Sequence, residues 1–211
     1  MKTSYDVLVI GAGPAGSTAA HRLAGAGYGV AMVEEHAVIG EPVDCTGILG
    51  LEAFEALALP PGIVVGSVDA VTIQSPAGIP ASYRGEAPLA YIVDRAELDR
   101  TLASRAQEKG AAPFLNTQAI DVARGACGVK VTCRTSEGEL RHLSAKVLIL
   151  AGGPRFAFHE RLGLRTRRQP VRAVLHHPGH PTTHCFCTAC HLTMRTPCCF
   201  QKRHETAQFC Y

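Results

Sequence analysis

The sequence contains no long uninterrupted apolar run, which excludes one class of protein at the outset. No stretch of the 211 residues approaches the roughly 18 consecutive apolar residues that a membrane-spanning helix requires. The apolar run near the start covers only about six residues before glycines interrupt it, and no cleavage pattern follows, so a secretory signal peptide is not expected. We therefore expect a cytoplasmic protein, with at most a peripheral contact at the inner face of the membrane.

Cysteine is scarce in most of the chain and concentrated at its end. Only Cys45, Cys127 and Cys133 precede residue 180, and the other six lie between Cys185 and Cys210. Three scattered thiols do not form a disulfide framework, so the body of the chain fits a reducing compartment.

The chain as a whole also lacks a strong excess of acidic or basic side chains, since its net charge is only +3. Residues 1–160 carry 13 basic and 17 acidic side chains, whereas residues 161–211 carry 8 basic and 1 acidic. The two parts of the chain therefore differ in character. A hydrophobic content of 46% fits a globular protein with one ordinary core, and we expect no nucleic-acid partner.

The first part of the chain has the pattern of a βαβ unit. Tyr5–Ile10 is a short apolar run, Ser17–Ala26 is rich in alanine at helical spacing, and Val30–Val33 reads as a second buried strand. Strand, helix and strand in about 30 residues predict a right-handed crossover and a parallel sheet.

A glycine motif joins the first strand to the helix. Gly11, Gly13 and Gly16 have the spacing G-x-G-x-x-G, and Glu34 ends the second strand 18 positions after Gly16. Gly11 suits a tight turn, Gly13 lets the backbone approach a pyrophosphate, and Gly16 permits close packing of helix on strand. The helix N-terminus offers N–H groups to phosphates, and Glu34 can accept hydrogen bonds from a ribose diol. The pattern predicts dinucleotide binding.

Pro14 and Ala15 complete the predicted cofactor-binding residues, and Pro14 suits the first helical turn because it lacks only an N–H that would be unpaired there. The motif alone does not distinguish FAD from NAD. Glu34 disfavours a 2′-phosphate, so NADP is the least expected ligand. The structural alternative is a glycine-rich turn without a ligand.

The rest of the chain adds helices and strands to this unit. Helical patterns cover Leu49–Leu59 and Asp94–Lys109, the second with Asp94 as N-cap. Residues 63–93 alternate apolar residues with Gly and Pro, which predicts antiparallel strands and an excursion toward a second domain. The remaining predicted strands are Ile120–Val122, Val129–Cys133, Leu140–Leu143 and a separate buried strand, Val147–Ala151.

Four segments carry a resemblance to a known family: DVLVIGAGPAGSTAAHRLAGAGYGVAMVEE, IGEPVDCTGILG, YIVDRAELDRTLASRAQEKGA and KVLILAGGPRFAFHERLGL. Together they resemble the geranylgeranyl reductase family of FAD-dependent oxidoreductases, which is similar to flavoproteins of the aromatic-hydroxylase type. The resemblance implies an α/β fold, with a Rossmann-type FAD-binding domain over residues 1–172 and part of a second, antiparallel-sheet domain.

The resemblance also implies a cofactor, a reaction and a set of site residues. FAD would lie with its adenosine and pyrophosphate at the glycine motif and Glu34, Arg95 would approach it, and the loop of Cys45 would lie beside the isoalloxazine ring. The implied reaction is reduction of carbon–carbon double bonds in a prenyl or lipid substrate, with NAD(P)H or another reductant as electron donor and Cys45 as candidate proton donor. The alternatives are an FAD-dependent monooxygenase and a non-catalytic, truncated flavoprotein fragment. For Arg95 the alternative is a solvated charge at a helix end.

Cys45 lies in the constrained loop GEPVDCTG. We expect Gly40, Pro42 and Gly47 to fix its path because backbone must approach a flavin edge closely. Cys45 also precedes the helix expected from Leu49, whose dipole would favour a thiolate. The alternative is a small buried thiol that only packs.

The chain departs from the family in its last third. Ala151-Gly152-Gly153 lacks the Asp-Gly of the family's second cofactor motif. Three positions further on, the family has a small residue where this chain has the bulky Phe156. The resemblance ends near Arg172. Residues 176–211 contain no Val, no Ile and one Leu, so residues 173–211 are predicted to be irregular. The change in composition fits a reading-frame slip or a truncated gene, and we expect a chain that is incomplete and weakly active.

The tail also raises the possibility of a metal site. Thiolates and imidazoles are zinc ligands, but their spacing here matches no paired-knuckle arrangement. We therefore predict no metal site. The residues concerned are Cys187, Cys190, His191, Cys198, Cys199 and His204.

Overall fold

The computed structural model describes residues 2–43, 45–74, 79–153, 158–159, 161–164, 199–203 and 206–210. The chain divides into two compact units. The first unit contains Met1–Glu41 and Ala96–Arg167, and the second contains Pro42–Arg95 and Arg168–Tyr211. The sequence places the excursion at residues 63–93, whereas the second unit already begins at Pro42.

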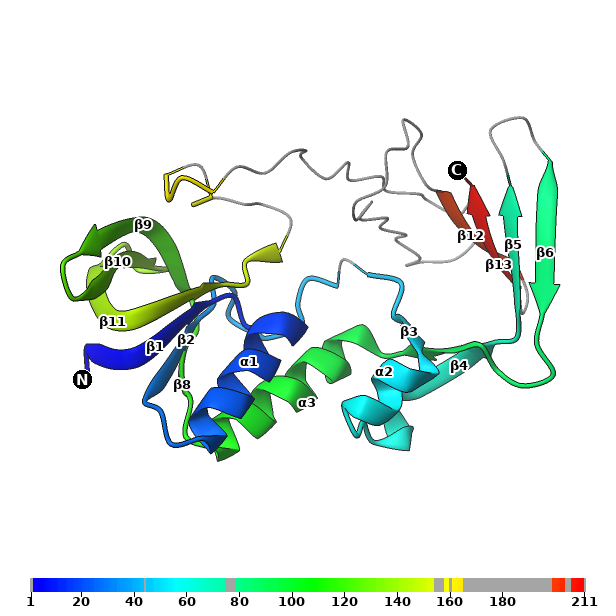
Figure 1. Cartoon of the computed structure of the whole chain (residues 1–211), viewed down its shortest axis with the longest axis horizontal. Helices are drawn as coiled ribbons and strands as arrows, with labels where there is room; N and C mark the ends of the chain where they lie inside the picture. The colour runs from blue at the N-terminus through cyan, green and yellow to red at the C-terminus, as the bar shows by residue number, and fades with distance from the viewer. Residues whose placement is uncertain are drawn as a thin grey trace. The chain divides into compact units, whose positions relative to one another are not determined.

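The first unit is built on a six-stranded sheet with the order β8-β2-β1-β11-β10-β9 (Figure 1). The pairs β8–β2, β2–β1 and β1–β11 are parallel, and β11, β10 and β9 form an antiparallel meander. The predicted α/β fold with a parallel Rossmann-type core is therefore confirmed. The strand bounds are β1 Ser4–Ile10, β2 Val30–Val33, β8 Ala112–Phe114, β9 Thr117–Gly125, β10 Gly128–Thr135 and β11 Leu140–Leu150.

Two helices, α1 (Pro14–Gly25) and α3 (Arg95–Glu108), lie side by side next to the parallel strands (Figure 1). Successive side chains of a strand point to opposite faces, so β1 contributes to two cores. One cluster joins strand residues to alanines in or just after the helices, namely Val7, Val9, Val30, Met32, Ala20, Ala24, Ala106 and Ala111. The other joins Leu8, Ile10, Ala31 and Val33 to the meander residues Val122, Val131, Cys133, Leu143 and Ala145. The alanines allow the helices to lie close to the sheet.

The second unit contains two smaller sheets, ordered β3-β7-β4 and β12-β13-β5-β6. The pairs β4–β7 and β5–β6 are antiparallel, which confirms the strand type predicted for residues 63–93. A short helix, α2, and a 3₁₀ turn, η1, connect the strands. The bounds are β3 Ile48–Gly50, α2 Leu51–Ala56, η1 Pro61–Ile63, β4 Val64–Val68, β5 Ala70–Gln74, β6 Pro80–Arg84, β7 Ala90–Val93, β12 Cys199–Arg203 and β13 Thr206–Cys210.

Some predicted elements differ from the structure in kind or in continuity. The helix predicted for Leu49–Leu59 is only α2, because Ile48–Gly50 pairs with β7 instead and Ala58 has a φ of 46° that ends the helical path. The strands predicted separately at Leu140–Leu143 and Val147–Ala151 are one strand, β11, because Ser144 is paired with both β1 and β10. The second of these is not fully buried, since Val147 is 52% exposed.

Two short strands, β12 and β13, lie within residues 173–211, the segment predicted to be an irregular tail. Strand β13 pairs in parallel with β5, and β12 pairs with β13. The strands pair through main-chain N–H and C=O groups, which every residue type except proline supplies in full. Of the six residues considered for zinc, only the backbone of Cys199, in β12, is described. The described part of the chain contains no cluster of metal-binding side chains.

Among the residues that the structure describes, no helix is long and apolar enough to cross a bilayer.

An exposed ion pair links β1 to β11 in the first unit, and its carboxylate also binds the residue before β2. Asp6 Oδ1 accepts a hydrogen bond of 2.7 Å from Lys146 Nζ, and Oδ2 accepts one of 2.9 Å from the Gly29 amide. The hydrogen bond from Lys146 is the main reason that the pKa of Asp6 lies below its ordinary value, and the bond from Gly29 lowers it further. A lowered pKa in the folded state stabilises the fold above the unfolded-state pKa, and this contribution is lost as the pH falls through the folded-state pKa.

We predict that Asp6→Asn lowers the free energy of unfolding at pH 7 and that its difference from the wild type shrinks as the solution is acidified. Urea unfolding at a series of pH values measures this difference. Lys146→Gln should reproduce the loss because it removes the main cause of the lowered pKa. A difference that stays constant down to acid pH would contradict the assignment.

Candidate functional site

The turn after β1 brings three strand ends together. Gly11 has a φ of +98°, and a Cβ there would collide with the carbonyl oxygen of Ala151, which directly follows β11. The Gly11 amide donates to the Val33 carbonyl of β2 at 2.8 Å, and the Ala151 amide donates to Ile10 at 2.8 Å. Only glycine fits this position, because both the backbone angle and the available space exclude a side chain.

Gly16 holds helix α1 against the same turn. A Cβ at this position would collide with the carbonyl oxygen of Gly11 and lie 3.2 Å from Val9 Cγ1. One residue further, the fully buried Ser17 donates from Oγ to the Ala12 carbonyl at 2.8 Å. The close packing of helix on strand that the sequence predicts at Gly16 is therefore present.

Gly13 differs from both of these glycines. Beyond the adjacent residues, no heavy atom of the described residues lies within 4 Å of the position that a Cβ would occupy there, and its φ of −69° and ψ of −174° are accessible to any residue. The protein's own packing therefore does not require glycine at this position. Open space beside a glycine is what a close-lying ligand would need.

The N-terminus of α1 opens onto this space. Gly13 is the N-cap, Pro14 is the first helical residue and Ala15 the second, and no side chain of the described residues caps the helix. First-turn N–H groups of a helix lack intrahelical partners and attract anions. The open cradle at Gly13 and these N–H groups together fit the pyrophosphate of a dinucleotide such as FAD.

Glu34, directly after β2, is joined to the glycine turn by its side chain. Its Oε2 accepts a hydrogen bond of 2.9 Å from the Ala12 amide. Its Oε1 accepts one of 3.1 Å from the His36 amide and one of 2.6 Å from His36 Nδ1. The Glu34 side chain is 13% exposed and that of His36 is 41% exposed. The carboxylate therefore lies at the surface of the turn with its orientation fixed by three donors.

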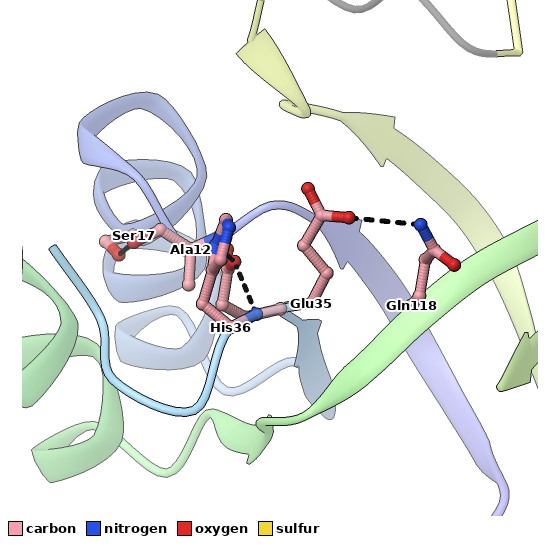
Figure 2. A network of polar contacts seen from close by, with 6 residues as sticks. Ala12, Ser17, Glu35, His36 and Gln118 are labelled. Carbon is pink, nitrogen blue, oxygen red and sulfur yellow. Dashed lines mark hydrogen bonds and ion pairs between the residues drawn. The ribbon is translucent and has the colours of Figure 1, made fainter. Parts of the chain in front are cut away.

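The neighbouring acidic residue, Glu35, contacts β9. Figure 2 shows Glu35 extending toward Gln118 of β9, whose Nε2 donates to Glu35 Oε2 at 3.1 Å. Of the two adjacent carboxylates, only Glu34 contacts the glycine turn among the described residues. His36 was not singled out from the sequence, because no spacing rule links a histidine two positions after the acid to this motif.

The residues in place of the family's second cofactor motif also lie at this turn. Ala151 supplies the carbonyl against which Gly11 packs, whereas Gly152 and Gly153 have no described heavy atom within 4 Å of a Cβ position. Ala151 therefore has a structural role at the end of β11. The tripeptide Ala151-Gly152-Gly153 contains no acidic side chain that could replace the Asp of the family's motif.

Cys45 lies in the second unit and its thiol is exposed. The alternative that it is a buried packing residue is wrong. The helix-dipole argument is also wrong, because strand β3 separates Cys45 from α2, which has only six residues. Gly40 and Gly47 have positive φ values and abut the protein's own backbone at Ala96 and Val93 respectively. The fold itself therefore requires these two glycines.

Arg95 is the first residue of α3 and is partly buried. The preceding residue, Asp94, is held by its amide, which donates to the Ile63 carbonyl at 2.8 Å. The predicted approach of Arg95 to a cofactor stays a prediction.

Comparisons with known proteins agree with this fold and motif. Residues 5–169 match the family described as pyridine nucleotide-disulphide oxidoreductase. The chain is similar to the digeranylgeranylglycerophospholipid reductase of Methanoculleus marisnigri, with 35% identity over 170 residues that cover 79% of this chain and 43% of the relative. The chain therefore spans less than half the length of this curated relative.

Two solved structures are also similar to this chain. The geranylgeranyl bacteriochlorophyll reductase-like protein of Thermoplasma acidophilum is similar with a TM-score of 0.69 and 29% identity, over 77% of this chain and 42% of that protein. A myxobacterial chondrochloren halogenase, described as a variant of FAD-dependent halogenases, has a TM-score of 0.58 and 25% identity, over 73% of this chain and 38% of that protein. The resemblance inferred from the sequence is confirmed.

We predict that native thiols of this protein differ sharply in reactivity. Burial raises the pKa of Cys133 on β10 to about 11, whereas Cys45 and Cys127 are exposed. Thiolates react and thiols do not, so iodoacetamide at pH 8 should alkylate Cys45 and Cys127 and leave Cys133 unmodified until urea unfolds the chain. Peptide mapping by mass spectrometry measures each site. Native labelling of Cys133 as fast as that of Cys127 would contradict its placement in the core.

Proposed function

The chain belongs to the pyridine nucleotide-disulphide oxidoreductase family, and on this premise we propose that it binds FAD and reduces carbon–carbon double bonds in the prenyl chains of a lipid. The first unit would hold the adenosine and pyrophosphate of FAD. The names of the similar reductase and of the reductase-like structure support the choice of a prenyl substrate. The electron donor would be NAD(P)H or another reductant.

The contrast among the three motif glycines carries the proposal for the cofactor. Gly11 and Gly16 are needed for internal packing, but Gly13 faces open space and has an unrestricted backbone. A glycine that the fold does not need is explained if a bound group lies against it. The neighbouring N–H groups of α1 suit a pyrophosphate, and the Glu34 carboxylate suits the ribose hydroxyls.

The chain's own residues would bind and orient the cofactor while the cofactor supplies the redox chemistry. When bound, FAD provides hydride transfer to an alkene carbon. The second alkene carbon needs a proton, and the exposed thiol of Cys45 is the group that we propose as its source. Arg95, at the start of α3, would contact the cofactor.

We predict that Gly13→Val abolishes FAD binding without unfolding the protein. The φ and ψ of Gly13 accept a branched residue, and no described atom beyond the adjacent residues lies within 4 Å of its Cβ position, but the valine side chain would occupy the pyrophosphate position. FAD binding is measured by equilibrium titration, and stability by thermal unfolding. A loss of at least about 100-fold in affinity, roughly 2.7 kcal/mol, with an unchanged melting temperature is expected.

Gly62→Val is the matched control, because Gly62 also has no described atom near its Cβ position but lies in η1 of the second unit. It should bind FAD as the wild type does. Gly16→Val should instead destabilise the fold, since its side chain collides with the turn. Wild-type FAD affinity in Gly13→Val would refute the nucleotide assignment.

We also predict that Cys45→Ala leaves FAD affinity unchanged and slows alkene reduction by roughly 100-fold, the size of a general-acid contribution. The assay is anaerobic single-turnover reduction of a digeranylgeranyl glycerophospholipid by the reduced, FAD-loaded chain, with mass spectrometry of the product. We expect the wild-type rate to be low, below about one per second. Cys127→Ala, at another exposed thiol, should match the wild type.

An unchanged rate in Cys45→Ala would remove this residue from the proton-transfer step. Formation of an oxygenated or halogenated product in air, without saturated lipid under anaerobic conditions, would instead favour the chemistry of the halogenase-like relative and contradict the proposed reductase.

A further inference from the structure

The two oxygens of the Glu34 carboxylate are not equivalent. Oε1 accepts hydrogen bonds from the His36 amide and from His36 Nδ1, whereas among the described residues Oε2 accepts only from the Ala12 amide. A carboxylate oxygen accepts about two hydrogen bonds through its lone pairs. Oε1 is therefore saturated, and Oε2 has one acceptor position left.

The short contact of His36 defines its role at this carboxylate. An ionised carboxylate has no proton to give, so Nδ1 must donate in the 2.6 Å contact. The backbone carbonyl of His36 accepts from the Asn116 amide at 3.0 Å, and the Glu34 carbonyl accepts from the Thr117 amide at 2.9 Å. These main-chain bonds fix both residues against the segment that links β8 to β9, so the imidazole meets Oε1 from a defined position.

We propose that His36 is a positioning residue that occupies Oε1 of Glu34 and leaves Oε2 as the single acceptor for the ribose of the bound nucleotide. This inference rests on the proposed function, because it concerns the same nucleotide site. A ribose diol would then donate through one hydroxyl to Oε2, beside the Ala12 amide, and the other hydroxyl would make no bond to Glu34. The site distinguishes the two hydroxyls although a free carboxylate could accept both.

The proposal differs from a purely structural role for His36. A structural role would change stability or the affinity for all nucleotides equally. A role in reserving Oε2 changes the relative affinity for nucleotides that lack one hydroxyl or the other. That ratio is the quantity to measure.

The experiment uses ADP, 2′-deoxy-ADP and 3′-deoxy-ADP as competitors of FAD on the whole 211-residue chain. In the wild type, removal of one hydroxyl should weaken binding roughly ten-fold, and removal of the other by less than about two-fold, as expected for one hydrogen bond to a charged acceptor. His36→Leu frees an acceptor position on Oε1, so the affinities of the two deoxy nucleotides should come within about three-fold of each other.

His36→Asn should restore the wild-type ratio, because its side-chain amide can donate to Oε1 in place of Nδ1. Glu35→Gln is the matched control at the adjacent acid, which faces Gln118, and it should keep the wild-type ratio.

Three results would overturn the inference. Equal losses for both deoxy nucleotides in the wild type would show that Oε2 is not the single acceptor, and a wild-type ratio in His36→Leu would show that His36 does not set it. In both cases FAD binding that is sensitive to Gly13→Val would leave the proposed function intact. Failure of the wild type to bind either FAD or ADP would refute the proposed function, and this inference with it.

Discussion

The close approach of Gly16 to the carbonyl oxygen of Gly11 is the constraint on which the site depends. It places the first turn of α1 directly above the end of β1, and Gly11 in turn packs against Ala151 at the end of β11. A side chain at either glycine would push helix and strands apart. Because the turn cannot relax, the N–H groups at the start of α1 and the open space at Gly13 have fixed positions before any ligand arrives, which reduces the ordering that binding would require.

The end of β2 is hydrogen-bonded to the same turn. The Glu34 carboxylate reaches the Ala12 amide and is itself held by His36, so the phosphate-facing and ribose-facing parts of the proposed site are joined by one side chain. The role proposed for the second unit depends on a single side chain, Cys45. Cys45 is an exposed thiol in a loop whose glycines are required by contacts with the protein's own backbone, and its proposed role depends on the family's chemistry rather than on its local surroundings.

The sequence predicts the first unit well because its signals are local. The apolar run, the glycine spacing and the acid after β2 each depend on residues that are near one another in the chain, and Val30–Val33 has the predicted bounds. Predictions fail where long-range pairing decides. Ile48–Gly50 is a strand because β7 lies beside it, and β11 is continuous because β1 and β10 both pair with Ser144. The contact between His36 and Glu34 was missed because it depends on the path of the chain after β2, which no motif describes.

Binding of FAD by the glycine turn of the first unit is the property on which the proposed function depends. The sharpest test is to saturate the purified chain with FAD, remove free nucleotide by gel filtration, and record the visible absorption of the protein. We predict the visible bands of a protein-bound flavin and the release of about one FAD per chain on denaturation, as expected for a single Rossmann-type site. A colourless protein, or one that retains NAD and no flavin under the same treatment, would contradict it.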